Sequence, residues 1–302
     1  MQLSILFRGT LFCIAALTAF DVRADLSPRQ ARKLIARMPG FELPGRAVRV
    51  KRISPISAAS TEATADVETA LRLEKNEQGQ WSVREIRTGP NQWEEIEVIA
   101  AAFKADVPLA SCHASDLLAA APNVTEPSVK RARCLIANLL NVKLPSDAVR
   151  IKQVSLLDIP LVSRPSALVV AVVQVDLRLV NDSKTGWRVS ELRTGNRDWA
   201  NLVAITGAVN EAKRKRAQAE LESIAKALEA FRIERGFYVA SDKQPTLIDY
   251  LSPRYLSPII RLDPWHRPYQ YQGERDHFTL RSTGPDGKEN TSDDIVLARS
   301  AG

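Results

Sequence analysis

The sequence predicts an α+β protein: two tandem α-β-β-β-α repeat units with antiparallel meanders, followed by a long helix and a small antiparallel sheet. Three observations predict this arrangement. A series of motifs occurs twice over the first two thirds of the chain, each copy carries apolar residues at strand spacing, and a helical pattern with one apolar face begins near residue 210. Of the 302 residues, 45% are hydrophobic and 25% charged, which excludes a disordered chain, a collagen-like repeat and a small disulfide scaffold.

Charge and the scarcity of reactive side chains narrow the possible functions. The chain has 42 Lys and Arg against 35 Asp and Glu, a formal net charge of +7. An excess of this size suits an acidic partner, anionic lipid or nucleic acid. Because it is spread along the chain, we interpret it as a solubility feature and expect no nucleic-acid partner. Three His and three Cys leave little material for a metal or nucleophilic site.

The first residues read as an export signal. Arg8 supplies a positive start, residues 10–20 form an apolar stretch, and residues 22–24 offer a small-residue cleavage site. A helix needs about 20 apolar residues to cross a bilayer, so a membrane anchor is the weaker alternative. We therefore expect a signal peptide at 1–24 and a mature chain in the periplasm that begins at Asp25 and has no transmembrane segment.

A duplication organises the first two thirds of the chain. The matching stretches are 31–36 with 132–137, 47–51 with 148–152, 71–73 with 177–179, 81–89 with 187–195, and Trp93 with Trp199. The offset is 101 residues at first and 106 later, because the second copy has extra residues near 156–165. We expect repeat unit 1 at 25–105, a linker at 106–125, repeat unit 2 at 126–207 and a C-terminal domain at 208–302.

Each copy predicts the same elements in the same order. Helix-start residues at Ser27 and Ser128 precede an apolar helix face. Alternating segments then predict two strands, and a turn with glycine leads to a strand that begins with tryptophan. A closing helix carries the second tryptophan. The predicted segments are 47–53, 65–75, the strand from Trp81 and the helix with Trp93 in copy 1, and 148–154, 168–180, the strand from Trp187 and the helix with Trp199 in copy 2.

The tryptophan-led strands contain charged residues that allow two interpretations. Glu85 and Glu191 have the chemistry of general acids or bases, and Arg87 and Arg193 could hold anions. Alternatively, tryptophan fills the seam between sheet and helix, and alternate Glu and Arg side chains pair across one strand face. We favour the structural interpretation, because two tandem copies suit binding or spacing better than two active sites.

Two cysteines remain after export. Cys112 and Cys134 flank the predicted linker, and an oxidising compartment favours a disulfide between them. Two buried free thiols, or a reactive cysteine beside His113, are the alternatives; no CxxC spacing supports the latter.

The last ninety-odd residues begin with a strong helical run. Leu221, Ile224, Leu228 and Phe231 recur on one helix face, and Gly236 is expected to end the helix. The segment 245–251 and short strands at 269–271 and 278–280 follow. The basic run 213–216 is most simply a solvated helix face, although contact with an acidic partner or lipid is the alternative.

This order of motifs resembles the periplasmic domain of the major pseudopilin of type II secretion systems. The matching features are the helix with Leu228 and Phe231 and the strings RGFYVAS, RLDPWHRPYQY and STGPDGKENTSDDI, over about 209–297. The resemblance implies a long helix packed on a small antiparallel sheet, and one bound calcium ion, with Asp286, Asp293 and Asp294 at the positions of the acidic ligands. His266 stands where the family commonly has glycine, and the chain has no prepilin-type Gly-Phe-Thr-Leu-Ile-Glu motif, so we expect no standard entry into a pseudopilus.

The residues give the calcium site some independent support, because closely spaced carboxylates on a loop with glycine can converge on a hard cation. A solvated acidic turn is the alternative. We expect an exported non-enzymatic protein with a calcium-stabilised head that binds proteins of the secretion machinery or the cell envelope. The alternatives are a periplasmic hydrolase that uses Glu85 or Glu191, and a carrier of apolar ligands.

Overall fold

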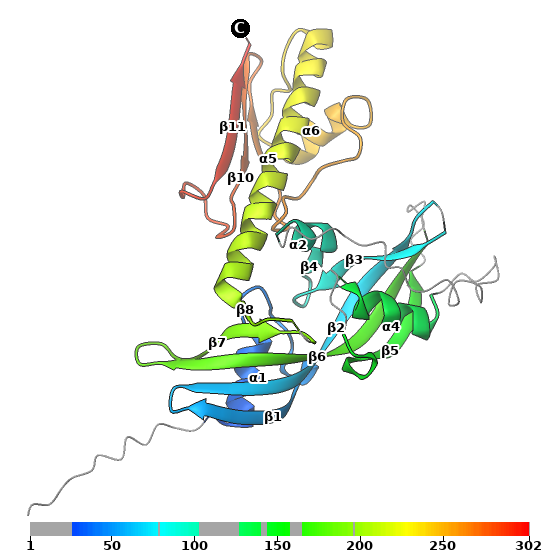
Figure 1. The fold of residues 1–302 in the computed structure, drawn as a ribbon. Helices are drawn as coiled ribbons and strands as arrows, with labels where there is room; N and C mark the ends of the chain where they lie inside the picture. The colour runs from blue at the N-terminus through cyan, green and yellow to red at the C-terminus, as the bar shows by residue number, and fades with distance from the viewer. Residues whose placement is uncertain are drawn as a thin grey trace, which may run out of the picture.

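The structure is a computed structural model that describes residues 26–77, 79–102, 127–139, 144–157, 165–195 and 197–301. It confirms the predicted class: a large antiparallel sheet carries helices, and a long helix lies against a separate three-stranded sheet (Figure 1). The predicted signal peptide and the linker at 106–125 lie outside the described residues. No helix in the described part of the chain is both long and apolar enough to span a membrane.

The two stretches that match in sequence fold with the same order of elements. A helix and a 3-10 turn precede three strands, and each stretch adds a short fourth strand before its closing helix. Copy 1 consists of α1 (Pro28–Ala36), η1 (Gly45–Ala47), β1 (Val48–Ser57), β2 (Ser60–Lys75), β3 (Trp81–Arg87), β4 (Trp93–Glu95) and α2 (Ile96–Ala102). Copy 2 consists of α4 (Val129–Ala137), η3 (Ser146–Ala148), β5 (Val149–Leu157), β6 (Ser166–Asp182), β7 (Gly186–Arg193), β8 (Ala200–Asn201) and α5 (Leu202–Arg235).

Both copies share one sheet. Its order is β4-β3-β2-β6-β7-β8, with β1 also paired to β2 and β5 to β6. The long strands β2 and β6 run antiparallel along their whole length, and Val67 lies opposite Val173. These two valines are equivalent positions of the copies, and Ala63–Leu177 and Leu71–Val169 are pairs at equal distances on either side. The copies are therefore related by an internal two-fold axis between Val67 and Val173, as in a symmetric dimer.

Each of the two cores of this region is built from both copies. Helix α1 packs on Leu177, Leu179 and Leu202 of copy 2, whereas α4 packs on Leu71 and Leu73 of copy 1. The helix of each copy thus covers the hairpin of the other, on the same face of the sheet. The opposite face carries Asp66, Arg72 and Arg178 with their ion-pair partners.

The head, defined here as residues 208–301, is organised around α5. The predicted apolar face of this helix is buried, with Leu221, Ile224, Leu228 and Phe231 each at most 4% exposed. It packs against α6 (Gln244–Leu251) and the sheet of β9 (Gln270–Gly273), β10 (His277–Ser282) and β11 (Ile295–Ser300). As predicted, the helix ends at Gly236, whose φ of 84° suits glycine and whose N–H donates to the Arg232 carbonyl at 2.7 Å.

The junction between copy 2 and the head differs from the expected boundary at 207/208. The closing helix of copy 2 and the head helix are one uninterrupted helix, α5, which starts at Leu202 (Figure 1). The Asn201 side chain caps it by accepting from the Ala204 N–H at 3.1 Å. Gly207 weakens a helix by only about 1 kcal/mol, which packing at both ends of α5 offsets.

Candidate metal-binding loop

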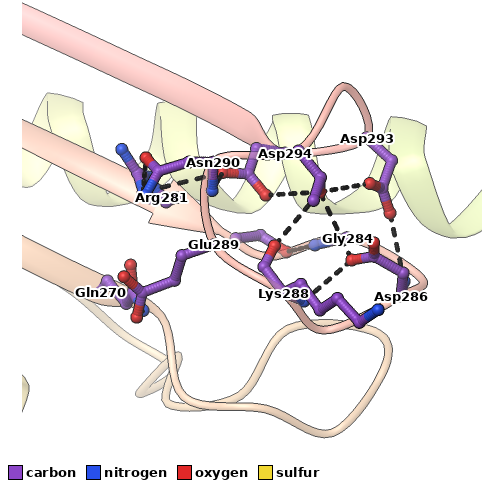
Figure 2. A network of polar contacts seen from close by, with 11 residues as sticks. Gln270, Arg281, Gly284, Asp286, Lys288, Glu289, Asn290, Asp293 and Asp294 are labelled. Atoms are coloured by element: carbon purple, nitrogen blue, oxygen red, sulfur yellow. Dashed lines mark hydrogen bonds and ion pairs between the residues drawn. The ribbon is translucent and has the colours of Figure 1, made fainter.

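The three aspartates singled out by sequence lie together on the loop between β10 and β11 (Figure 2). The loop leaves β10 through Gly284, whose φ is 60°. A Cβ atom there would lie 2.4 Å from the Asp293 carbonyl oxygen, so only glycine lets the two arms of the loop approach. The sequence therefore brings Asp286 close to Asp293 and Asp294 although seven residues separate the first two.

The three carboxylates converge on the hydroxyl of Thr291. Its Oγ1 lies 2.6 Å from Asp293 Oδ1 and 3.4 Å from Oδ1 of both Asp286 and Asp294. The Lys288 carbonyl oxygen is also near, at 3.2 Å. Four hard oxygens thus surround one point of the loop, which is the type of donor set that calcium takes. Sequence reasoning missed Thr291, because threonine is common in solvated turns.

Backbone amides hold the carboxylates in place (Figure 2). The N–H of Asp286 donates to Asp293 Oδ2 at 3.1 Å, and the N–H of Lys288 donates to Asp286 Oδ1 at 2.8 Å. The hydrogen bond from the Thr291 hydroxyl, followed by that from the Asp286 N–H, lowers the pKa of Asp293 below its ordinary value. Asp293 is therefore ionised at neutral pH.

Asp294 differs from the other two aspartates because it is tied to the sheet. Its side chain is only 7% exposed, and its Oδ2 lies 3.7 Å from Nη1 of Arg281 on β10. The same guanidinium donates to Asn290 Oδ1 at 3.1 Å, and the Asn290 N–H donates to Asp294 Oδ2 at 2.9 Å. Oδ2 of Asp294 thus contacts Arg281 and the Asn290 N–H, whereas its Oδ1 lies near the Thr291 hydroxyl.

A second string that carries the resemblance, RLDPWHRPYQY, supports the loop. Buried Asp263 accepts from the N–H groups of Trp265 and Arg267 at 2.9 Å and from the Ser282 hydroxyl at 2.6 Å. The Arg267 guanidinium then donates to the carbonyl oxygens of Gly284 and Pro285. This turn, residues 263–267, fixes the backbone where the acidic loop begins, which explains why the two strings occur together.

Another acidic group lies at the opposite end of the hairpin. Among the described residues, Glu274, Asp276 and His277 place their ligand atoms within 4.8 Å of one another. The three loop aspartates are spread more widely than this. A hydrogen bond to Asp276 raises the pKa of His277, and the same bond lowers the pKa of Asp276. All three side chains are exposed and the imidazole is held by a carboxylate, so this group serves below as a matched control.

The glutamates of the tryptophan-led strands are ion-paired in both copies. Glu85 pairs with Arg72, and Glu191 lies 2.6 Å from Arg178 on the neighbouring strand. Arg72 stacks on Trp93 at 4.7 Å and Arg178 on Trp199 at 4.4 Å. The partners come from the adjacent strand, not from Arg87 or its equivalent; Arg193 instead pairs with Asp176 at 3.1 Å.

Two clefts of some size flank the first copy, and charged side chains line most of both. The larger, about 620 Å³, lies between β2, β3, α2 and α5, and its carboxylates Glu74, Glu85, Glu95 and Glu97 each pair with an arginine.

The interpretation of 213–216 as a solvated face is wrong for two of its four residues. Lys213 is buried and its Nζ lies 2.6 Å from Glu94, and Arg216 pairs with Glu95 and Glu220. A charge run carries no information about a partner more than a hundred residues away.

The predicted disulfide stays a prediction, because Cys112 and His113 lie outside the described residues; Cys134 packs on the core beneath α4.

Comparison with known proteins agrees with the loop and its supporting turn. Residues 204–298 match the family model of type II secretion system (T2SS) protein G. That protein is the major pseudopilin, so the C-terminal third of the chain is a pseudopilin-like domain. The match covers α5 almost from its first turn and extends into β11. No curated protein and no solved structure matches the chain.

Proposed function

We propose that this chain is an exported, non-enzymatic protein whose pseudopilin-like head binds one calcium ion and acts through protein contacts in type II secretion or the cell envelope. The observation that carries the proposal is the convergence of Asp286, Asp293 and Asp294 on Thr291, within the part of the chain that matches protein G. The family match supports partners in the secretion machinery.

The donor set fits calcium better than a transition metal. It consists of carboxylate, hydroxyl and carbonyl oxygens, with no His or Cys among the described residues of the loop. Asp286 and Asp293 would hold the ion, with Oδ1 of Asp294 as the third acidic ligand. A bound ion would neutralise three carboxylates that otherwise repel one another.

The non-enzymatic part of the proposal is supported by the pairing of the charged residues. Glu85 and Glu191, the residues of the hydrolase alternative, form ion pairs in equivalent positions of both copies, as expected for a structural role. A general acid or base must transfer a proton to or from the substrate, and an ion pair with arginine does not provide for this.

Calorimetry on the mature chain tests the calcium claim. Calcium at a hundred times its dissociation constant should stabilise the folded head by about 2.7 kcal/mol relative to chelator. Magnesium should substitute poorly, because it requires a tighter octahedron. Asp293→Ala should abolish the calcium effect, whereas Asp276→Ala, which removes a carboxylate from the other acidic group of the head, should preserve it. Identical melting in calcium and chelator, together with no heat of binding, would reduce the loop to an acidic turn.

Pairwise interaction assays against the components of the type II secretion system test the partner claim. The full mature chain should bind at least one component in calcium, and Asp293→Ala should weaken that contact. No contact with any component, for a protein that binds calcium normally, would separate the chain from secretion while leaving the metal site intact.

A further inference from the structure

The head contacts the first copy through helix α2 and through strand β4, which provides the polar contacts. All three residues of β4 are engaged: Glu94 by Lys213, Glu95 by Arg216, and the Trp93 carbonyl by His266. The Lys213–Glu94 pair is largely dry, with side chains 6% and 18% exposed. Removal of one partner from a buried ion pair leaves an uncompensated charge, which is strongly destabilising.

The charges of β4 belong to the first copy alone. The equivalent residues of β8 are Ala200 and Asn201, although Trp93 and Trp199 are matched. Both copies form the same strand at this position, so the fold does not require Glu94 and Glu95. Their partners are on α5, which indicates that the two glutamates serve the head.

His266 reaches β4 from an unusual backbone conformation. Its φ is 66°, a left-handed value that few residues other than glycine adopt. From there its Nε2 lies 2.6 Å from the Trp93 carbonyl oxygen and, since a carbonyl only accepts, Nε2 carries the proton. A glycine would fit this turn with less strain, and histidine adds the contact to the first copy.

The same turn touches the acidic loop on its other side. Arg267 follows His266 directly and binds the carbonyl oxygens of Gly284 and Pro285, immediately before Asp286. Asp263 holds both ends of the turn through the N–H groups of Trp265 and Arg267. Movement of the loop backbone therefore displaces Arg267, and with it His266.

A second route runs through the head helix. The Tyr269 hydroxyl donates to Glu220 at 2.6 Å, and Glu220 also accepts from Arg216 at 2.8 Å, which in turn binds Glu95. Burial first, and then the hydrogen bond to Glu220, raises the pKa of Tyr269, so its proton stays in this chain of contacts at all physiological pH values. The segment around the turn is thus connected to β4 twice, through His266 and through Tyr269.

We propose that the turn at 263–267 couples the acidic loop to the docking of the head on β4, so that an ion in the loop strengthens the dock. The coupling rests on the proposed calcium function. Linkage makes it reciprocal: docking must raise calcium affinity by the same factor by which calcium favours docking. The head and the first copy are then one calcium-dependent unit.

Isothermal titration of calcium into the full mature chain gives the decisive numbers. His266→Gly and Glu94→Ala, neither of them in the acidic loop, should each lower calcium affinity about fivefold or more. His266→Asn, which tolerates a left-handed φ and keeps an amide donor, should stay within about twofold of the original chain. Glu211→Ala removes an exposed carboxylate from α5 and serves as the charge control. Unchanged affinity in both His266→Gly and Glu94→Ala would overturn the coupling and leave the calcium site standing.

Hydrogen exchange on the same proteins separates this failure from a failure of the calcium proposal. Calcium should slow exchange in peptides covering both 284–294 and 93–102, and His266→Gly should abolish only the second effect. If the chain binds no calcium, Gly284→Ala tests the link alone, because its Cβ clashes with the loop. Faster exchange at 93–102 in that variant would support the coupling, and unchanged exchange would refute it. Circular dichroism establishes that every variant is folded.

Discussion

The two copies of the repeat share their element order but end differently. The first ends in α2, which is described over the seven residues Ile96–Ala102, whereas the second ends in α5, which has 34 residues and becomes the core of the head. The head is covalently attached to copy 2 and docked by charge on copy 1, where α2 packs against α5.

This difference separates the features that both copies share from those that only the first copy has. The Arg–Glu–Trp groups occur in both copies, at Arg72, Glu85 and Trp93 and at Arg178, Glu191 and Trp199, so they belong to the shared fold. The glutamates of β4 occur in only one copy and form their ion pairs with the head. Each position of one copy can thus be compared with the matching position of the other.

The largest expected effect tests whether the cores are truly exchanged between copies. Leu73→Ala and Leu179→Ala remove equivalent side chains, both fully buried, beneath α4 and α1 respectively. Each should lower the free energy of unfolding by about 2–5 kcal/mol in urea titrations followed by circular dichroism. A negligible loss for either variant would mean that the corresponding core does not need the other copy.

The next largest effect is expected from substitutions that give β4 of the first copy the residues of β8 in the second. Glu94→Ala reproduces Ala200 and leaves Lys213 buried without its partner, so the free energy of unfolding should fall by about 3 kcal/mol. Glu95→Asn, which reproduces Asn201, should cost less, because Arg216 keeps Glu220. The double variant Glu94→Leu/Lys213→Met should recover most of the loss; equal damage in single and double variants would show that the charges are not what matters.

A smaller effect should distinguish the two tryptophans. Trp199 lies under two guanidiniums, those of Arg178 and Arg193, whereas among the described residues only Arg72 stacks on Trp93. Each cation–π contact of this kind stabilises by about 0.5–1 kcal/mol. Trp199→Leu should therefore cost about that much more than Trp93→Leu in thermal melts, and the reverse order would contradict the stacking.

The smallest effect concerns the hairpins at the far end of each copy. Asp182 accepts from the N–H groups of Lys184 and Thr185, which lower its pKa below the ordinary 3.8, and its equivalent in copy 1 is Asn76. Because the folded pKa is depressed, the stabilisation is complete above the unfolded pKa and is lost as pH falls through the folded value. Protection factors at 181–186, which are corrected for the intrinsic pH dependence of amide exchange, should fall below about pH 4, and Asp182→Asn should remove this fall. Equal acid sensitivity in the Asn76 hairpin would point to a different cause.

Local chemistry was readable from the sequence wherever the determining residues are close along the chain. The buried face of α5, its end at Gly236 and the acidic loop follow from spacing and from the motif match. The pairing of β2 with β6 does not, because alternation tells which face of a strand is buried and not which strand lies beside it. Likewise, no residue close to Lys213 in the sequence indicates that it pairs with Glu94.

Two further features were hidden by competing local signals. The expected domain boundary at 207/208 falls within the continuous helix α5, where tertiary packing at Leu202 and from Ala217 onward overrides the weak helix propensity of Ile205, Thr206 and Gly207. Thr291 and Arg281 complete the loop, yet each is an ordinary residue for its position. Only the three-dimensional convergence of the carboxylates identifies them.

Because α5 is continuous, it also fixes the rotation of the head about the helix axis relative to the repeat core. Each residue of a helix turns the chain by about 100° and advances it by about 1.5 Å. Deletion of one residue between Leu202, in the repeat core, and Lys213 would rotate the head by that angle and carry its cations away from β4. An insertion of seven residues would restore the direction and still lift the head about 10 Å off the strand. The number of residues in this part of α5 therefore determines how the head is oriented relative to β4. The segment cannot vary in length as an interdomain linker does.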